Sequence, residues 1–253
     1  MNPTLETLHS LRSIHGAFTE QSVPEETIAA ILEASLRAAN ASNRQSYSII
    51  VVDDREAMGE LTGYKASHAL IYCVDYNRVI AAAEHTANEF TVRGMPELIS
   101  GAIDASLAAQ TAAIAARALG VESLLTNGIH RGDPQKLFDI LRIPENYCFP
   151  LVALLLGYAA EEPKHLRGRL KGPGVIHRGV YRHALPDELD EIVSQYDDPE
   201  AHIAAGFPWR DKGFEHYLDW FYQVWSKRFP QEPGLSSTWR LLERTGFLEI
   251  DEY

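Results

Sequence analysis

The order of apolar and polar residues predicts helices and strands that alternate along the chain. A first helix is expected over Pro3–Leu11, ending at the Arg12-Ser13 turn. A second helix is expected after Ser22–Glu26, where a polar cap, a proline and two acidic residues suit the start of a helix. Apolar residues follow at helical spacing, and the pattern stops at Asn40.

Three short apolar runs are typical of buried strands: Ser48–Val52, Ala69–Asp75 and Leu151–Leu156. Asp104–Leu119 predicts a long helix that contains eight alanines and is closed by Gly120. So many small side chains would let another helix or a second subunit approach closely, although alanine is also simply a good helix former. A further helix is expected to begin at Gly132-Asp133-Pro134 and to run to Leu141. Interleaved helices and strands predict an α+β, or layered α/β, domain.

The composition changes after about His183, and we expect the chain to divide there into residues 1–183 and 184–253. A short helix is expected over Leu185–Tyr196, followed by a turn at Tyr196–Pro199. Six apolar and aromatic residues then fall on one helical face: Phe214, Tyr217, Leu218, Phe221, Val224 and Trp225. Such a stripe is more often core or subunit packing than a cofactor platform, so we interpret the tail as structural.

Charge and cysteine content disfavour several classes of function. The 253 residues include 23 Lys and Arg against 35 Asp and Glu, and a net charge of −12 disfavours nucleic acid as a partner. Cys73 and Cys148 are too few for a disulfide framework, and Cys73 lies in an apolar run where a buried thiol is expected. No signal peptide is evident, and the apolar run Phe149–Leu156 is too short to span a membrane. We therefore expect a cytoplasmic protein with no membrane or nucleic-acid partner.

Three polar clusters stand out from the packing pattern: Leu11–His15, Asn40–Tyr47 and Lys164–Arg169. Arginine presents a rigid fork of donors that suits phosphate oxygens, while hydroxyls and amides suit the remainder of a phosphorylated ligand. Arg167 and Arg169, two apart on an extended segment, would point the same way and form a phosphate clamp. Each cluster alone is more simply interpreted as a solvated loop, and together they only suggest a ligand site.

In this order, the clusters and their neighbours resemble the motifs of the nitroreductase family over about residues 5–183. The matching segments are Arg12-Ser13-Ile14-His15 with Phe18 and Val23-Pro24-Glu25-Glu26, Ala39–Tyr47, Asp104 with Ala108 and Gln110, the turn Leu125-Thr126-Asn127-Gly128 after a central strand, and Arg167-Gly168-Arg169. No single motif is specific, but five in the right order are strong.

The resemblance implies a central, mostly antiparallel sheet flanked by helices, in an intertwined homodimer that binds FMN. Residues 1–183 would be the FMN-binding domain, and residues 184–253 a helical, aromatic-rich extension packing on the dimer. Arg12 and Ser13 would hold the FMN phosphate and ribityl chain, Arg167 and Arg169 would close on the phosphate, and His15 would lie beside the flavin N1 and O2 atoms. The residues implied to reach the flavin from the second subunit are Asn40, Ala41, Ser42, Asn43 and Gln45. Leu125, Thr126, Asn127 and Gly128 would lie along the ring, with backbone groups of the last two near N5.

The implied activity is electron transfer from NAD(P)H, through flavin N5, to a small electron-poor acceptor such as a nitroaromatic, a quinone or an enone. Because the flavin carries this chemistry, neither a catalytic side chain nor a metal is expected. The alternative is a non-catalytic flavin- or nucleotide-binding module used for sensing or protein interaction. The sequence chooses neither the acceptor nor between NADH and NADPH, since no Gly-x-Gly-x-x-Gly segment is present.

The chain departs from the family pattern at several positions. The first arginine of the opening motif is Leu11 here, and its last basic residue is His15. Ser46 and Tyr47 replace the proline and tryptophan of the second motif. Because histidine gains and loses its charge near neutral pH, His15 would couple a proton to flavin reduction. A histidine that only bonds the ribityl chain, or turns to solvent, is an equally good interpretation.

Overall fold

The computed structural model describes residues 2–131, 133–204, 207–228 and 237–248, which belong to two compact units. Unit 1 contains the described residues up to Glu162 together with residues 237–248. Unit 2 contains the described residues from Pro163 to Arg228. The chain therefore leaves unit 1 after residue 162 and returns to it near the C-terminus.

Unit 1 contains four strands: β1 (Tyr47–Val52), β2 (His68–Asp75), β3 (Glu122–Thr126) and β4 (Cys148–Gly157). Its described helices are α1 (Pro3–His9), α2 (Glu25–Ser35), α3 (Arg55–Thr62), α4 (Asn77–His85), α5 (Met95–Ala118), α6 (Pro134–Leu141) and α9 (Ser237–Arg244), with single 3-10 turns η1 (Ala41–Asn43) and η2 (Gly128–His130). Unit 2 contains α7 (Pro186–Asp197), α8 (Tyr217–Trp220), a π-helical turn η5 (Phe221–Trp225) and the 3-10 turns η3 (Pro199–Ala201), η4 (Arg210–Lys212) and η6 (Ser226–Arg228).

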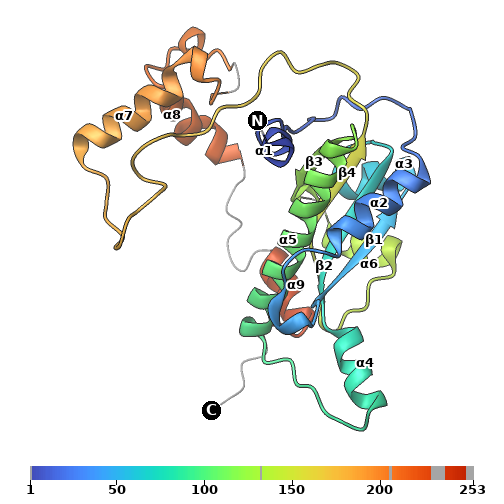
Figure 1. Ribbon diagram of the computed structural model, residues 1–253. Coiled ribbons are helices and arrows are strands. Elements are labelled where there is room, and N and C mark those ends of the chain that lie inside the picture. Colours follow the sequence, from blue (N-terminus) through green and yellow to red (C-terminus); the bar gives the residue numbers. More distant parts are fainter. Residues whose placement is uncertain (1, 132, 205–206, 229–236, 249–253) are drawn as a thin grey trace. The chain divides into compact units, whose positions relative to one another are not determined.

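The four strands form one antiparallel sheet in the order β1-β2-β4-β3 (Figure 1). Central strand β2 is apolar throughout because both of its faces are covered. Leu70 and Tyr72 pack with the side chains of α2 and α5, whereas Ile71 and Cys73 pack with those of α3 and α6 on the other face. The predicted α+β architecture, with a mostly antiparallel sheet flanked by helices, is confirmed.

Helix α5 is longer than predicted and uses its alanines differently from the expected subunit contact. It begins at Met95, nine residues before the predicted start, with Pro96 in its first turn. Six alanines are buried in the same chain, where α5 packs against α2, β2 and β4: Ala105, Ala108, Ala109, Ala112, Ala113 and Ala116. Among the described residues, α5 is the one helix whose length and hydropathy would suit a membrane span. In this structure it is a core helix on the sheet.

Two strands differ from the sequence prediction. β4 begins at Cys148, three residues before the predicted start, and includes Pro150 at an irregularity in its pairing with β2. Proline has no backbone N–H to donate to the hydrogen bonds between strands. A central strand therefore tolerates proline at a shift in register, as it does here. The expectation of a central strand before Asn127 is wrong, because β3 pairs only with β4 and lies at an edge of the described sheet.

Unit 2 is held together by aromatic packing. The ring of Trp220 stacks on Phe207 with centroids 3.8 Å apart, and Tyr217 packs against both Trp209 and Trp220. The aromatic stripe predicted from the sequence thus contributes to the core of unit 2. It lies on α8 and the π-helical turn together and not on one continuous α-helix, and Leu218 is not part of the cluster.

The compact units differ from the division predicted at residue 183. Residues 163–185 belong with α7 in unit 2, and the C-terminal segment returns to unit 1. Phe247 is fully buried there, with edge contacts to the rings of Tyr76 and Tyr147. A backbone hydrogen bond of 2.9 Å from Tyr147 to Thr245 adds to this attachment. The amino-acid composition indicates the aromatic segment, but it does not predict that the C-terminal segment returns to unit 1.

Candidate functional site

The segment after α1 runs beside the ends of strands β3 and β4. The amide of Ile14 donates to the carbonyl of Ser123 over 3.0 Å, and the amide of Thr19 donates to the carbonyl of Tyr158 over 2.8 Å. Ile14 is buried, so its neighbours Ser13 and His15 point to the exposed side, as alternation in extended chain requires. The predicted polar residues are thus presented to solvent by a segment that backbone bonds fix to the sheet.

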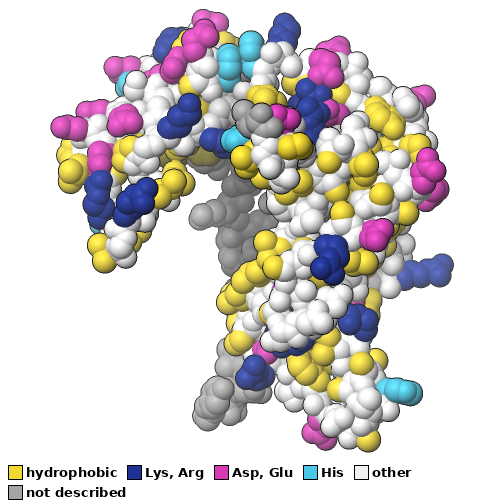
Figure 2. Space-filling view, in the orientation of Figure 1, with side chains coloured by type: hydrophobic (Ala, Val, Ile, Leu, Met, Phe, Trp, Pro, Cys, Tyr) yellow, Lys and Arg dark blue, Asp and Glu magenta, His cyan; other side chains and the backbone are white. Residues whose placement is uncertain are grey.

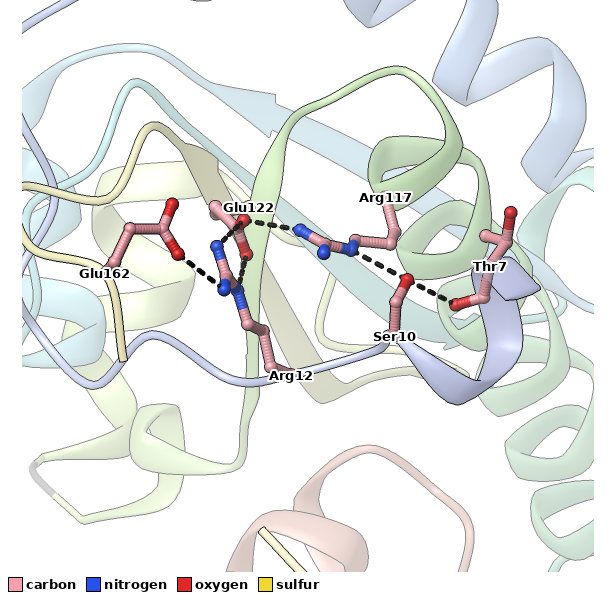
Figure 3. Close-up of polar contacts among 6 residues, drawn as sticks. All are labelled: Thr7, Ser10, Arg12, Arg117, Glu122 and Glu162. Carbon is pink, nitrogen blue, oxygen red and sulfur yellow. Dashed lines mark hydrogen bonds and ion pairs between the residues drawn. The ribbon is translucent and has the colours of Figure 1, made fainter. Parts of the chain in front are cut away.

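Arg12 lies in this segment and bonds to two carboxylates (Figure 3). Its Nε donates to Glu122 Oε2 over 3.0 Å, and its Nη2 donates to Glu122 Oε1 over 2.5 Å. Its Nη1 lies 2.7 Å from Glu162 Oε2. The hydrogen bonds with Glu122 and Glu162 raise the pKa of Arg12, and the bond with Arg12 lowers the pKa of Glu162. Arg12 is therefore charged and already partnered on two edges.

Glu122 is the centre of a larger network. Its Oε1 also accepts from Nη1 of Arg117 on α5, over 2.6 Å, and Arg117 in turn bonds to the hydroxyl of Ser10 (Figure 3). The carboxylate of Glu122 is only 9% exposed. A carboxylate at this depth is stable only when it is paired, and here two guanidinium groups compensate it. The network joins α1, the Arg12 segment, α5 and β3.

The loop before β1 is held by helix α5. The buried carboxylate of Asp104 accepts from the amide of Ala41 over 2.8 Å and from the amide of Ser46 over 3.1 Å. One turn earlier, a Cβ on Gly101 would lie 3.0 Å from the carbonyl oxygen of Ser46, and still closer to a valine side chain, so glycine permits this close packing. The motif aspartate therefore anchors the predicted flavin loop.

Three residues of that loop adopt left-handed backbone conformations although none is glycine. Ser42, Asn43 and Gln45 have φ values of 52°, 54° and 51°. The Asn40 side chain accepts from the amide of Gln45 over 3.3 Å and so closes the loop on itself. Such conformations are uncommon for non-glycine residues and cluster at ligand sites, where the surrounding structure enforces them.

The end of β3 and the turn after it, Leu125–Gly128, run from the exposed Leu125 to the buried Gly128. Thr126 Oγ1 accepts from the amide of Gly128 over 3.0 Å, while Leu125 and Asn127 are exposed. A Cβ on Gly128 would lie 2.7 Å from the carbonyl oxygen of Thr62, so the turn requires glycine there. Because the segment of Arg12 bonds to β3 at Ser123, unit 1 places both clusters along the same strand.

The loop 40–46 lies at the other end of the sheet. The carbonyl of Ser46 accepts from the amide of Asp75, the last residue of β2, whereas the first residue, His68, pairs with Leu156 next to Ser123. The eight residues of β2 span roughly 23 Å at about 3.3 Å per residue. Within one chain, unit 1 therefore does not bring the loop to the Arg12 segment.

Arg167 and Arg169 lie in unit 2 and are both exposed. The guanidinium of Arg169 donates to the carbonyls of Arg167 and Gly168, over 3.0 and 2.9 Å. A Cβ on Gly168 would fall 1.9 Å from the carbonyl oxygen of Ala201, so glycine lets this segment lie against the η3 turn. The structure thus fixes the local conformation of the arginine pair within unit 2.

Sequence reasoning missed the partners of Arg12. Glu122 begins β3 and Glu162 follows β4, and neither stands in a motif. Arg117 occupies the last turn of α5, where a basic residue is ordinary. One weak signal could have indicated Glu122: it is an acidic residue at the start of an apolar strand, and the structure shows that it is buried there.

The family model described as "Nitroreductase family" matches residues 10–158, which contain Arg12, Glu122, the loop 40–46 and the turn 125–128, whereas Glu162 follows the matched range. The chain belongs to the nitroreductase family. Its relatives include "FMN reductase [NAD(P)H]" of Bacillus subtilis strain 168, which is 32% identical over 208 residues covering 78% of this chain and 81% of the relative. "Oxygen-insensitive NADPH nitroreductase" of Salmonella typhimurium strain LT2 is 31% identical over the same shares.

Solved structures agree with the assignment to the nitroreductase family. The structure titled "Structure of B. megaterium NfrA2" matches with a TM-score of 0.79 and 27% identity, over 98% of each chain. That of the "hypothetical oxidoreductase YcnD from Bacillus subtilis" matches with a TM-score of 0.78 and 28% identity, again over 98% of each chain. Both matches extend well beyond residue 158, so the nitroreductase fold includes the later part of the chain.

Proposed function

We propose that this nitroreductase-family chain is an FMN-dependent oxidoreductase that transfers electrons from NAD(P)H to a small acceptor. The observation that carries the proposal is its similarity, over about four-fifths of its length, to proteins named for this activity. They include "FMN reductase [NAD(P)H]" and, at 29% identity, "NADPH-flavin oxidoreductase" of Vibrio harveyi. A non-catalytic binding module is not favoured, because the relatives are named as reductases.

The described residues fit a phosphorylated, ring-containing cofactor. Arg12 offers a fixed cation whose outer nitrogen Nη1 faces an 80% exposed carboxylate, and Ser13 adds an exposed hydroxyl. Arg167 and Arg169 supply two further exposed guanidinium groups. Guanidinium is the group best suited to phosphate oxygens, so we assign the phosphate end of FMN to these residues.

When bound, FMN supplies the two-electron chemistry between NAD(P)H and the acceptor. The protein supplies position and environment. The turn Leu125–Gly128 is fixed by the bond from the amide of Gly128 to Thr126, and we assign the backbone at Asn127 and Gly128 to the ring edge near N5. The exposed side chain of Leu125 would lie against the ring and shield part of it from water. His15, on the exposed side of its segment, is assigned to the N1 and O2 edge.

We propose that the site is completed by a second copy of this chain. Asn40, Ala41, Ser42, Asn43 and Gln45 are assigned to the flavin, yet their loop lies at the opposite end of β2 from the Arg12 segment. A homodimer resolves this, because the partner's loop can reach the flavin of the first subunit.

An exposed apolar stripe on α5 supports the dimer. Met95, Ile99, Ile103 and Leu107 recur every four residues and are 41–54% exposed. Figure 2 shows hydrophobic side chains gathered over this part of α5. The stripe, rather than the predicted alanine face, is therefore our candidate for the contact between subunits. We expect light scattering of the FMN-loaded protein to give twice the mass of 28.3 kDa, and a stable loaded monomer would contradict the shared site.

We also propose a class of electron acceptor and a cellular location for the protein. An electron-poor small molecule, such as a nitroaromatic, quinone or enone, suits a flavin donor. A cytoplasmic location agrees with two cysteines that are buried and not joined in a disulfide.

The purified protein tests the proposal directly. We expect a yellow protein that releases FMN, and not FAD, on denaturation, and whose flavin absorbance bleaches when NADPH is added anaerobically. A colourless protein that takes up no added FMN would overturn the proposed function, and a flavin that NADPH fails to reduce would favour the binding module.

A further inference from the structure

The two carboxylates that bond to Arg12 differ sharply in burial. The side chain of Glu122 is 9% exposed, whereas that of Glu162 is 80% exposed. They also occupy different edges of the guanidinium: Nε and Nη2 face Glu122, and Nη1 faces Glu162 (Figure 3). One edge of Arg12 is thus held inside the protein and the other is open to exchange.

Glu122 is fixed in place. It belongs to β3, where it pairs with Gly157, and its carboxylate serves Arg117 as well as Arg12. Removing it would leave two guanidinium groups without their shared partner at a depth where unpaired charge is expensive. An incoming anion therefore cannot replace Glu122, and the inner edge of Arg12 keeps the same orientation with or without ligand.

Glu162 is held far more weakly. Its side chain bonds to Arg12 from the chain that follows β4, and an exposed ion pair of this kind contributes little net free energy. The bond with Arg12 lowers the pKa of Glu162, so the carboxylate is ionised at neutral pH and acts as an anion at Nη1. A phosphate group offers more oxygens and more charge at the same nitrogen.

We propose that Glu162 is an internal competitor for the flavin phosphate. In the ligand-free protein it occupies Nη1 of Arg12, and a phosphorylated flavin displaces it while Glu122 holds the guanidinium still. Glu162 thereby sets the affinity for flavins that carry a phosphate, and leaves unphosphorylated flavins unaffected. The inference rests on the proposed function, since it takes Arg12 as a ligand of the FMN phosphate.

The test compares FMN with riboflavin, which lacks the phosphate. Dissociation constants are measured from flavin fluorescence, at one ionic strength, for the ligand-free wild type, Glu162→Gln and Glu161→Gln. Glu161 is the matched control, because it is exposed, loses the same charge, and makes no ion pair among the described residues. We expect Glu162→Gln to bind FMN about two- to fivefold more tightly than Glu161→Gln, with no change for riboflavin.

Three results would overturn the role of Glu162: FMN affinity equal in the two variants, weaker FMN binding by Glu162→Gln, or equal tightening for riboflavin. The last would mean that the substitution alters the whole site and not the phosphate contact. If none of the three proteins binds FMN, the proposed function itself fails. If the wild type binds FMN and Glu162→Gln has the same FMN affinity as Glu161→Gln, only the proposed role of Glu162 is rejected, and the proposed function stands.

Discussion

Replacing Asp104 by asparagine should loosen the loop that we assign to the flavin of the partner subunit. The carboxylate accepts from two backbone amides, those of Ala41 and Ser46, and asparagine can accept from only one of them. The amide nitrogen of the variant would then face an N–H group, leaving a buried donor without a partner. Losing one hydrogen bond to a charged group costs about 1.5–3 kcal/mol. Total stabilities of domains are about 5–15 kcal/mol, so the variant should fold.

Urea unfolding of Asp104→Asn measures this loss, and FMN titration measures its effect on the site. The control is Asp53→Asn, which makes the same chemical change at an exposed residue after β1. We expect a free energy of unfolding lower by about 1.5–3 kcal/mol only for Asp104→Asn, together with weaker FMN binding. Equal midpoints for the two variants would show that Asp104 does not anchor the loop. A destabilised variant with normal FMN affinity would show that the loop does not touch the flavin.

Three further outcomes are expected. Arg167→Ala and Arg169→Ala should each weaken FMN binding roughly ten- to hundredfold, because each variant would lose a charged hydrogen bond to phosphate. Neither should unfold the chain, because both side chains are exposed. Unchanged FMN affinity in both variants would place the phosphate elsewhere. His15→Lys should make the flavin midpoint potential depend less steeply on pH between pH 5.5 and 8.5, leaving only the slope from the proton that the flavin itself takes up on reduction. Curves of the same shape would exclude His15 as the ring's electrostatic partner. A hydrogen bond to Asp197 raises the pKa of His216, so this pair stabilises unit 2 fully below about pH 6.5 and less as the pH rises through the raised pKa. Tryptophan-monitored melting of wild type and His216→Gln should therefore converge with rising pH, and a constant difference would contradict the assignment.

Local sequence patterns were sufficient for the elements of the core. The apolar run of β2 is continuous because α2 and α5 cover one face and α3 and α6 the other, and that continuity is visible in the sequence. The start of α6 was predicted from Asp133, whose side chain caps the helix by accepting from Gln135. Such signals involve residues only a few positions apart, so no knowledge of the tertiary structure is needed.

Contacts between distant residues were not predictable in the same way. Arg12 and Glu122 are 110 positions apart, and Ala41 and Asp104 are 63 apart. Family motifs indicated Arg12 and Asp104 as residues of interest, but no spacing identifies their partners. The sequence likewise gave no sign that the Arg12 segment and the loop lie at opposite ends of β2. Whether the five site clusters meet around one flavin stays a prediction that the variants above address.

The return of the chain to unit 1 means that unit 2 is an insertion and not an appendage. A stop codon after residue 183, where composition alone would divide the protein, would delete α9 and leave Tyr76 and Tyr147 facing the space that Phe247 fills. Losing a buried phenylalanine costs about 3–5 kcal/mol by itself. Anyone wishing to study the sheet domain of unit 1 by itself, without the Arg167 and Arg169 that we assign to the phosphate, should therefore excise residues 163–233 and bridge the gap with a flexible linker. The C-terminal helix stays in place as a native part of the domain it completes.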